Sequence, residues 1–167
     1  PVEHEGTYPL PEAQLDRFLL KSVMAYPSAE AELEMLARHA AGFDPERDAS
    51  LGAAAISADE ALALRSIVDA VRVTPEVQRY ITDIARATRE EPSITRGASP
   101  RATVALMRAA RGAAVLEGRE FVTPDDVKSR APAVLRHRVT HAPELEVEGR
   151  SIDDVLAIVT GRVAVPD

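Results

Sequence analysis

The chain has 167 residues, no cysteine and a formal net charge of −7. This length allows one or two small domains, and the acidic balance argues against a general nucleic-acid coat. Without cysteine, a disulfide framework and a thiolate metal site are excluded, so we expect a cytoplasmic protein in a reducing compartment. No apolar run reaches the ~18–20 residues of a membrane span.

The first residue is Pro1 rather than a methionine, and no signal-like segment opens the chain. We therefore expect a piece of a longer protein, or a processed or truncated one. Hydrophobic residues make up 46% of the chain and aromatic residues only 4%, so a core must consist mostly of Ala, Leu, Val and Ile.

Residues 1–10 contain two prolines and a glycine and are expected to form a loop, followed by a short helix over 11–18. Within that helix Leu15 and Phe18, three apart, are expected to face the core. The apolar run 18–24 is consistent with a buried strand, although periodicity does not separate it from a helical segment. As a strand it has no obvious partner in this chain.

From Ser28 onward the apolar spacing is helical, with a looser stretch over 43–56. An apolar stripe at three- and four-residue steps is predicted in the helix over 100–116: Ala102, Ala105, Leu106, Ala109, Ala113 and Leu116. Residues 139–147 are expected to form one or two short strands before a turn at 148–150. The predicted helices are 28–41, 58–71, 75–89, 100–116, 124–136 and 152–160.

Six of the seven predicted helix starts place an acid at the second helical position, where it complements the positive end of the helix macrodipole. The seventh, with Ser99 as the N-cap and Pro100 at the first position, places Arg101 there. Helix N-termini bind phosphate, and a guanidinium adds a bidentate donor fork. We infer that Arg101 faces a nucleotide phosphate; the alternative is a solvated surface arginine.

Several ordered motifs over nearly the whole chain resemble the MoxR-type AAA+ ATPases. Residues 97–102 are similar to the sensor 2 motif of that family, and residues 1–18 to its segment just after sensor 1. Further matches are Thr88-Arg89, residues 118–127 and residues 131–138.

The resemblance implies a mainly α fold: a helical lid bundle preceded by a short helix–strand remnant of the AAA+ α/β core. It places the core remnant at residues 1–26 and the lid domain at 27–167. Arg101, as sensor 2, would reach the β- or γ-phosphate in its own subunit. Ser99 and Pro100 would fix the helix start, and Gly97 would allow close backbone approach or a positive φ.

The resemblance also gives Arg17 the place of an arginine finger, which acts on the nucleotide of the neighbouring subunit. Judged from the residues alone, Arg17 is a cation that stabilises a helix C-terminus. A finger acting between subunits implies a homo-oligomeric ring, expected to be a hexamer. The family is thought to remodel client proteins, some with von Willebrand factor A domains, using ATP and Mg²⁺.

The chain contains no Gly-x-x-x-x-Gly-Lys-Ser/Thr phosphate loop and no apolar strand ending in paired acids for magnesium. We therefore expect this chain alone neither to hydrolyse ATP nor to bind it tightly. Two other functions stay open: a nucleic-acid-binding helical module, suggested by eight arginines against four acids over 79–119, and a non-catalytic interaction scaffold.

Three further candidates are weaker. His137 and His141 have a spacing that can bind metal on one helix face, but Thr140 and Pro143 argue against a continuous helix, so we expect no metal site. The run 3–5, Glu-His-Glu, could form an acid–base cluster, and the resemblance instead makes it a loop near the nucleotide. Arg96 could touch phosphate, although a solvated loop arginine is favoured.

Overall fold

The computed structural model describes residues 10–47, 56–147 and 149–166. Its internal contacts divide the chain into two compact units. The first unit combines residues up to Lys21 with those from Ser66 onward, and the second is Ser22–Arg65. All the buried hydrophobic residues among those described belong to the first unit.

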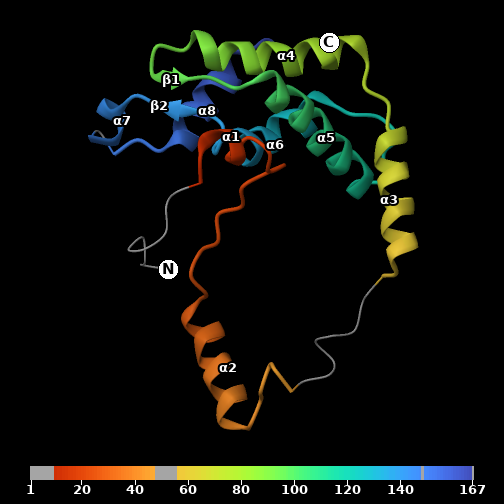
Figure 1. The fold of residues 1–167 in the computed structure, drawn as a ribbon, viewed down its shortest axis with the longest axis vertical. Coiled ribbons are helices and arrows are strands. Elements are labelled where there is room, and N and C mark those ends of the chain that lie inside the picture. The colour runs from red at the N-terminus through yellow and green to blue at the C-terminus, as the bar shows by residue number, and fades with distance from the viewer. Residues whose placement is uncertain (1–9, 48–55, 148, 167) are drawn as a thin grey trace. The chain divides into compact units, whose positions relative to one another are not determined.

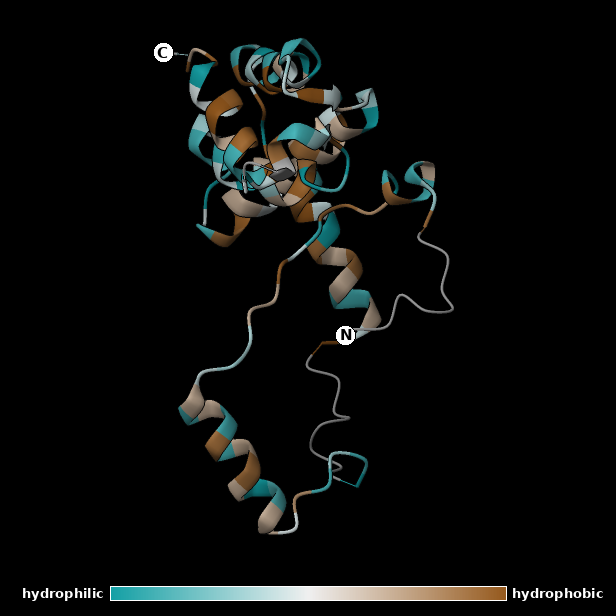
Figure 2. Ribbon diagram, turned by 90° about the vertical axis from the view of Figure 1, so that its left-hand side faces the viewer, coloured by the Kyte–Doolittle hydropathy of each residue, from teal (hydrophilic) through white to brown (hydrophobic). Residues whose placement is uncertain are grey.

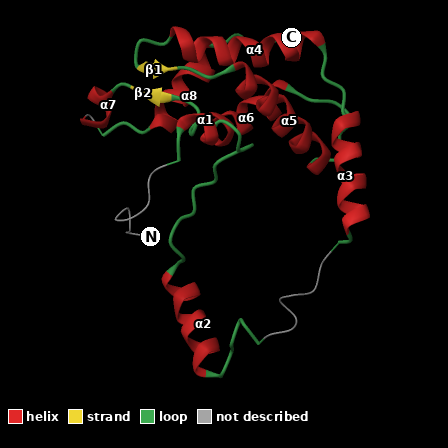
Figure 3. Ribbon diagram, in the orientation of Figure 1, coloured by secondary structure: helices red, strands yellow, loops and turns green. Residues whose placement is uncertain are grey.

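The mainly α fold is confirmed, since helices predominate and the described strands form one short pair (Figures 1 and 3). Each predicted helix is present, with ends within a few residues of those expected. In the second unit lies α2 (Ala29–Ala40), and α3 (Ala58–Ala70) crosses the division between the units. The first unit contains α1 (Glu12–Leu15), α4 (Pro75–Glu90), β1 (Ile94–Arg96), α5 (Pro100–Leu116), α6 (Pro124–Leu135), β2 (Thr140–His141), α7 (Pro143–Val147) and α8 (Ile152–Arg162).

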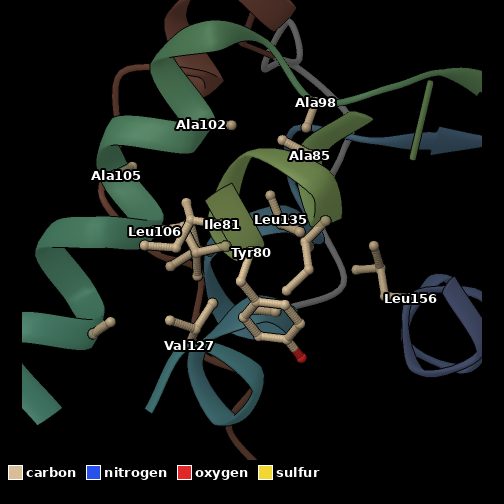
Figure 4. Close-up of a cluster of buried hydrophobic side chains, with 14 of the residues drawn as sticks. Tyr80, Ile81, Ala85, Ala98, Ala102, Ala105, Leu106, Val127, Leu135 and Leu156 are labelled. Carbon is tan, nitrogen blue, oxygen red and sulfur yellow. The ribbon is translucent and has the colours of Figure 1, made fainter. Parts of the chain in front are cut away.

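The core of the first unit lies where α4, α5, α6 and α8 meet, with α5 and α6 packed most extensively. Figure 4 shows Ile81 of α4, Leu106 of α5 and Leu135 of α6 pointing toward one another. Alanines at 102, 105, 110, 113 and 114 are buried on α5, and these small side chains allow close helix approach. The predicted stripe is wrong at its end, because Leu116 is 84% exposed.

Local capping explains the helix starts. Ser28, Thr74 and Ser99 accept a hydrogen bond from the backbone N–H three residues on. The start of α3 has the reciprocal hydrogen bonds of a capping box between Ser57 and Glu60. Because these contacts span only three residues, the sequence predicts them well.

The region after α6 differs from expectation. Instead of one or two strands over 139–147, only Thr140–His141 is a strand, and Pro143–Val147 is the short helix α7. Proline suits the first position of a helix, which explains this start. The antiparallel partner is β1, Ile94–Arg96, a strand that the sequence analysis did not predict.

The expected strand over 18–24 is wrong for this structure. These residues have neither strand nor helix geometry and are exposed. Of the pair expected to face the core, Leu15 is half-buried but Phe18 is 55% exposed. A strand needs a neighbour to satisfy its backbone groups, and no described segment pairs with this one.

The second unit contains an amphipathic helix without a buried residue. Hydrophilic and hydrophobic residues alternate along α2 in Figure 2. At its end, the Arg38 guanidinium lies 4.4 Å from the centre of the Phe43 ring. Among the helices described in either unit, none is long and apolar enough to cross a membrane.

An ion pair next to α6 reinforces its capping box. Arg119 donates to both carboxylate oxygens of Asp126, at 2.7 and 2.6 Å. Asp126 also accepts from the backbone N–H of Thr123, whose hydroxyl in turn accepts from the Asp126 amide. The hydrogen bonds from Arg119 are the main cause that lowers the pKa of Asp126 to about 2.

We predict that Asp126→Asn lowers the free energy of unfolding by about 2 kcal/mol at pH 7, because it removes a bidentate charged acceptor. A carboxyl whose pKa is lowered by folding stabilises above its unfolded value and loses that contribution as pH falls through the folded value. Denaturant titrations should thus show wild-type stability falling from about pH 4 to about pH 2. The variant should lack this component of the pH dependence.

The matched control is Asp125→Asn, an exposed acid in the same helical turn that forms no ion pair with an arginine of the described ranges. It should cost only ~0.5 kcal/mol, as expected for a charge near a helix N-terminus. Equal losses for the two variants would show that the ion pair contributes nothing specific.

Candidate functional site

The two predicted phosphate-contacting arginines are exposed. Arg101 occupies the first turn of α5, and Arg17 follows Asp16, the C-cap residue of α1. In the described part of the chain, neither side chain forms an ion pair or a hydrogen bond. Other exposed arginines, such as Arg108, share this property, so only the surroundings distinguish Arg17 and Arg101.

The start of α5 has the predicted geometry. Ser99 is extended, with φ −74° and ψ 165°, and its hydroxyl accepts from the amide of Ala102 at 3.2 Å. Pro100 occupies the first helical position. Among the described helices of eight or more residues, α5 alone has no acid in its first turn. This first turn therefore carries the positive end of the helix dipole together with the cation of Arg101.

The loop before α5 lies against the end of α4. The Thr88 hydroxyl accepts from the amide of Ala98 at 2.9 Å and donates to the Ala85 carbonyl. Arg89 donates through Nε to the Ala98 carbonyl at 2.7 Å. A Cβ on Gly97 would lie 2.7 Å from the Arg89 Cα. Of the two roles expected for Gly97, close backbone approach is therefore the one observed.

Asp16 connects the segment around Arg17 to the start of α5. Its carboxylate oxygens lie 3.1 and 3.0 Å from the Ser99 hydroxyl, which donates to them. The same carboxylate accepts from Arg138 Nε at 3.0 Å. Residues 16, 99 and 138, which are far apart in sequence, thus meet in one cluster, in which Arg138 is buried and Asp16 and Ser99 are half-buried. We call Asp16, Ser99 and Arg138 the linking triad.

Three consecutive residues after α6 hold the segment that follows α1, as the closeness of α1 and α6 in Figure 1 suggests. Arg138 donates to the backbone carbonyls of Asp16, Phe18 and Leu19. His137 Nε2 lies 3.1 Å from the Phe18 carbonyl. Arg136 donates to the Lys21 carbonyl at 3.1 Å.

Electrostatics in this cluster favour a neutral His137. Burial is the main cause that lowers the pKa of His137, opposed by its hydrogen bond to the Phe18 carbonyl. Burial likewise lowers the pKa of Arg138, and the hydrogen bond that Arg138 donates to Asp16 opposes this shift. The positive charge of Arg101 also contributes to lowering the pKa of Arg138.

The weaker candidates have other roles. Arg96 forms an ion pair with Glu12 at 2.6 Å and donates to the Thr140 hydroxyl. His137 and His141 do not share a helix, because α6 ends at Leu135 and His141 lies in β2. No group of three or more potential ligands gathers in the described ranges. The Glu-His-Glu run at 3–5 lies outside the described residues.

The sequence analysis missed Asp16 and Arg138 as members of the site. Both lie inside motifs that carry the family resemblance, and that was the available signal. Their partners are 83 and 122 residues away in sequence, so no local spacing could connect them. Thr88 and Arg89 were also quoted as a match, and the structure explains them as the support of residues 97 and 98.

Comparison with known proteins defines the class of protein. A family model described as AAA lid domain matches residues 86–159, which include α5, α6 and the linking residues Ser99 and Arg138. A solved structure of a candidate ATPase from Cytophaga hutchinsonii superposes with a TM-score of 0.85 and 32% identity. That match covers 100% of this chain and 52% of the other. The chain therefore contains an AAA+ lid domain.

Curated relatives narrow the class to one family. The uncharacterized protein YeaC of Bacillus subtilis is 40% identical over 166 residues, covering 99% of this chain and 51% of YeaC. Chaperone MoxR1 of Mycobacterium tuberculosis is 36% identical over 175 residues, covering 99% of this chain and 45% of MoxR1. The chain belongs to the MoxR-type AAA+ proteins and spans about half the length of the curated relatives it matches.

We predict that Gly97→Ala lowers the free energy of unfolding by ~1–3 kcal/mol, because the new Cβ overlaps the backbone of Arg89. The matched control is Gly112→Ala in α5, where nothing lies within 4 Å of an added Cβ. That substitution should stabilise by up to ~1 kcal/mol through helix propensity. Thermal unfolding of both variants measures the two effects, and a loss in both would refute the steric explanation.

Proposed function

We propose that this chain is the lid-bearing part of a MoxR-type AAA+ ATPase, and that Arg17 and Arg101 are its contributions to ATP hydrolysis. The observation that carries the proposal is the linking triad. Two exposed arginines that form no ion pair within the described chain, Arg17 predicted as the finger and Arg101 as sensor 2, follow members of this triad within two residues in sequence, Asp16 and Ser99, which are hydrogen-bonded to each other. No other exposed arginine of the described chain lies within two residues of a member of the linking triad.

In this proposal Arg101 binds the β- or γ-phosphate of ATP in its own subunit, and Arg17 acts on the nucleotide of the neighbouring one. The α5 start fits an anion, because an exposed guanidinium and a helix N-terminus occur together there and the first turn of α5 itself contains no acid. Ser99 and Pro100 fix the turn that presents Arg101, and Gly97 lets the preceding loop approach α4. Bound Mg²⁺–ATP would supply the phosphoryl group and the metal ion that neutralises its charge. The phosphate loop and the paired acids that would hold them do not occur among the motifs of this chain.

The wider role follows from the same proposal. A finger that acts between subunits requires a ring, which we propose to be a homohexamer. The relative named chaperone MoxR1 supports a role in remodelling or maturing client proteins, which we propose to include proteins with von Willebrand factor A domains. We place the boundary between the core remnant and the lid near Pro27, and we propose a cytoplasmic location.

We predict that the isolated chain binds ATP with a dissociation constant weaker than ~1 mM, because one guanidinium and one helix terminus supply few charged hydrogen bonds. Isothermal titration calorimetry with Mg²⁺–ATP measures this affinity. A micromolar dissociation constant would contradict the proposal, since the chain has no phosphate loop.

In the intact protein, Arg17→Ala should lower ATP turnover by ~10³-fold, the lower end of the effect of arginine fingers in other nucleotide hydrolases. Arg101→Ala should lower it by ~10–100-fold, since a charged hydrogen bond contributes roughly 1.5–3 kcal/mol. Arg108→Ala is the control: it is exposed on the same face of α5 and has no ion pair in the described chain. Unchanged turnover in the first two variants would favour a scaffold without a nucleotide role.

Mixing the two variants tests which subunit each arginine serves. If Arg101 acts in its own subunit and Arg17 on the next, rings of mixed Arg17→Ala and Arg101→Ala subunits contain some complete sites and regain turnover. If both arginines serve the neighbouring nucleotide, no arrangement of these two variants completes a site. Absence of rescue would therefore overturn the assignment of Arg101 to its own subunit.

A further inference from the structure

The guanidinium of Arg138 is fully engaged. Its side chain is 2% exposed, and it donates through Nε to Asp16 Oδ1 at 3.0 Å. Through Nη1 it donates to the carbonyls of Leu19 at 3.0 Å and Val134 at 2.6 Å. Through Nη2 it donates to the carbonyls of Asp16 and Phe18. Only the planar five-donor fork of an arginine can serve acceptors in all these directions.

The acceptor residues lie on both sides of Arg17. The Asp16 carbonyl belongs to the peptide group that enters Arg17, and the Phe18 carbonyl belongs to the peptide group one residue beyond it, so Arg138 holds the backbone on either side of Arg17. The Arg17 side chain itself is exposed and makes no hydrogen bond or ion pair within the described chain. The hydrogen bonds of Arg138 therefore restrain the backbone around Arg17 and leave the Arg17 guanidinium free to act elsewhere.

Hydrophobic packing does not explain this arrangement. Phe18, Leu19 and Leu20 are 55%, 47% and 46% exposed, so the segment buries little apolar surface. Burying a guanidinium is costly, and apolar residues of similar volume often replace buried ion pairs without loss of stability. A buried arginine that serves an otherwise exposed segment thus points to positioning rather than to stability.

Through Asp16, the contacts of Arg138 also extend to the start of α5. The carboxylate of Asp16 is shared between Arg138 Nε and the Ser99 hydroxyl, and Ser99 caps the helix that carries Arg101. The charge of Arg101 is close enough to lower the pKa of Arg138. A displacement of α5 would thus pull on Asp16 and move Arg17 with it.

We propose that Arg138 is a positioning residue for Arg17, and that the linking triad makes Arg17 and the start of α5 move as one body. This inference rests on the proposed function and deepens it. When the phosphate bound by Arg101 changes during hydrolysis, the resulting shift of α5 reaches Arg17 through Asp16. The triad thereby couples the two arginines that serve ATP hydrolysis within a single subunit.

The test uses the intact ATPase and the variants Arg138→Met, Arg17→Ala and the double variant. Arg138→Met should lower kcat by ~10²-fold with KM changed less than about threefold, because a finger displaced by about 1 Å loses its alignment in the transition state. If Arg138 acts through Arg17, the double variant should be no slower than Arg17→Ala alone. Additive losses would show an independent structural role and overturn the inference.

Rescue of activity by a neighbouring subunit is a second measurement. A general structural defect of the Arg138→Met subunit would not be rescued in this way. Arg138→Met subunits keep their own phosphate loop, so a neighbour with an intact finger should restore their turnover. Mixing them with subunits disabled in the phosphate loop but carrying the native Arg17 should therefore recover activity. Failure of this rescue, where Arg17→Ala subunits are rescued under the same conditions, would overturn the inference.

Two further variants test whether the effect is specific to Arg138 and whether it survives if Arg138→Met does not fold. Arg136→Met removes a neighbouring arginine, 15% exposed, that donates to the more distant Lys21 carbonyl and pairs with Asp153. It should change kcat less than about threefold. Asp16→Asn keeps the side-chain shape and should reproduce the kcat loss and the non-additivity with Arg17→Ala if Arg138→Met does not fold. Full activity of Arg17→Ala would instead refute the proposed function itself, which separates the two failures.

Discussion

The ion pair between Arg138 and Asp16 is the contact on which the candidate site depends. It joins the end of α6 to the segment after α1 across 122 residues of sequence, in a position where the arginine is almost fully buried. The Asp16 carboxylate also accepts from the Ser99 hydroxyl, so the start of α5 belongs to the same cluster. Without this pair, the segment around Arg17 would have few apolar contacts to hold it, since its large side chains are exposed.

The first unit therefore relies on two different kinds of interaction. Apolar burial between α4, α5, α6 and α8 determines how the helices pack, and the alanines of α5 allow its close approach to α6. Directional hydrogen bonds determine where the loops lie: Thr88 and Arg89 for residues 97 and 98, and Arg138 for residues 16–19. Helix packing tolerates small adjustments, whereas a fork of five donors accepts few geometries, so the site residues are placed mainly by the second kind.

Much of the fold could be predicted from local patterns, and the errors have physical causes. Helix starts were right because a cap such as Ser99 and its acceptor lie three residues apart. The expected strand over 18–24 was wrong, because an apolar run becomes a strand only beside another strand. Leu116 followed the correct period yet is exposed, because none of the described elements buries it at the end of α5. The pairing of β1 with β2 joins residues more than forty apart, and no short pattern indicates it.

By itself, the sequence determined the helices, their caps, the exceptional Arg101 at a helix start and the resemblance to one family, because each depends on neighbouring residues or on ordered motifs. Only the tertiary structure decided that Asp16, Ser99 and Arg138 meet, and that Gly97 is required by the backbone of Arg89. These contacts join segments that the chain separates widely. Their geometry depends on how the helices pack, and that packing is set by the summed burial of many side chains rather than by any local pattern.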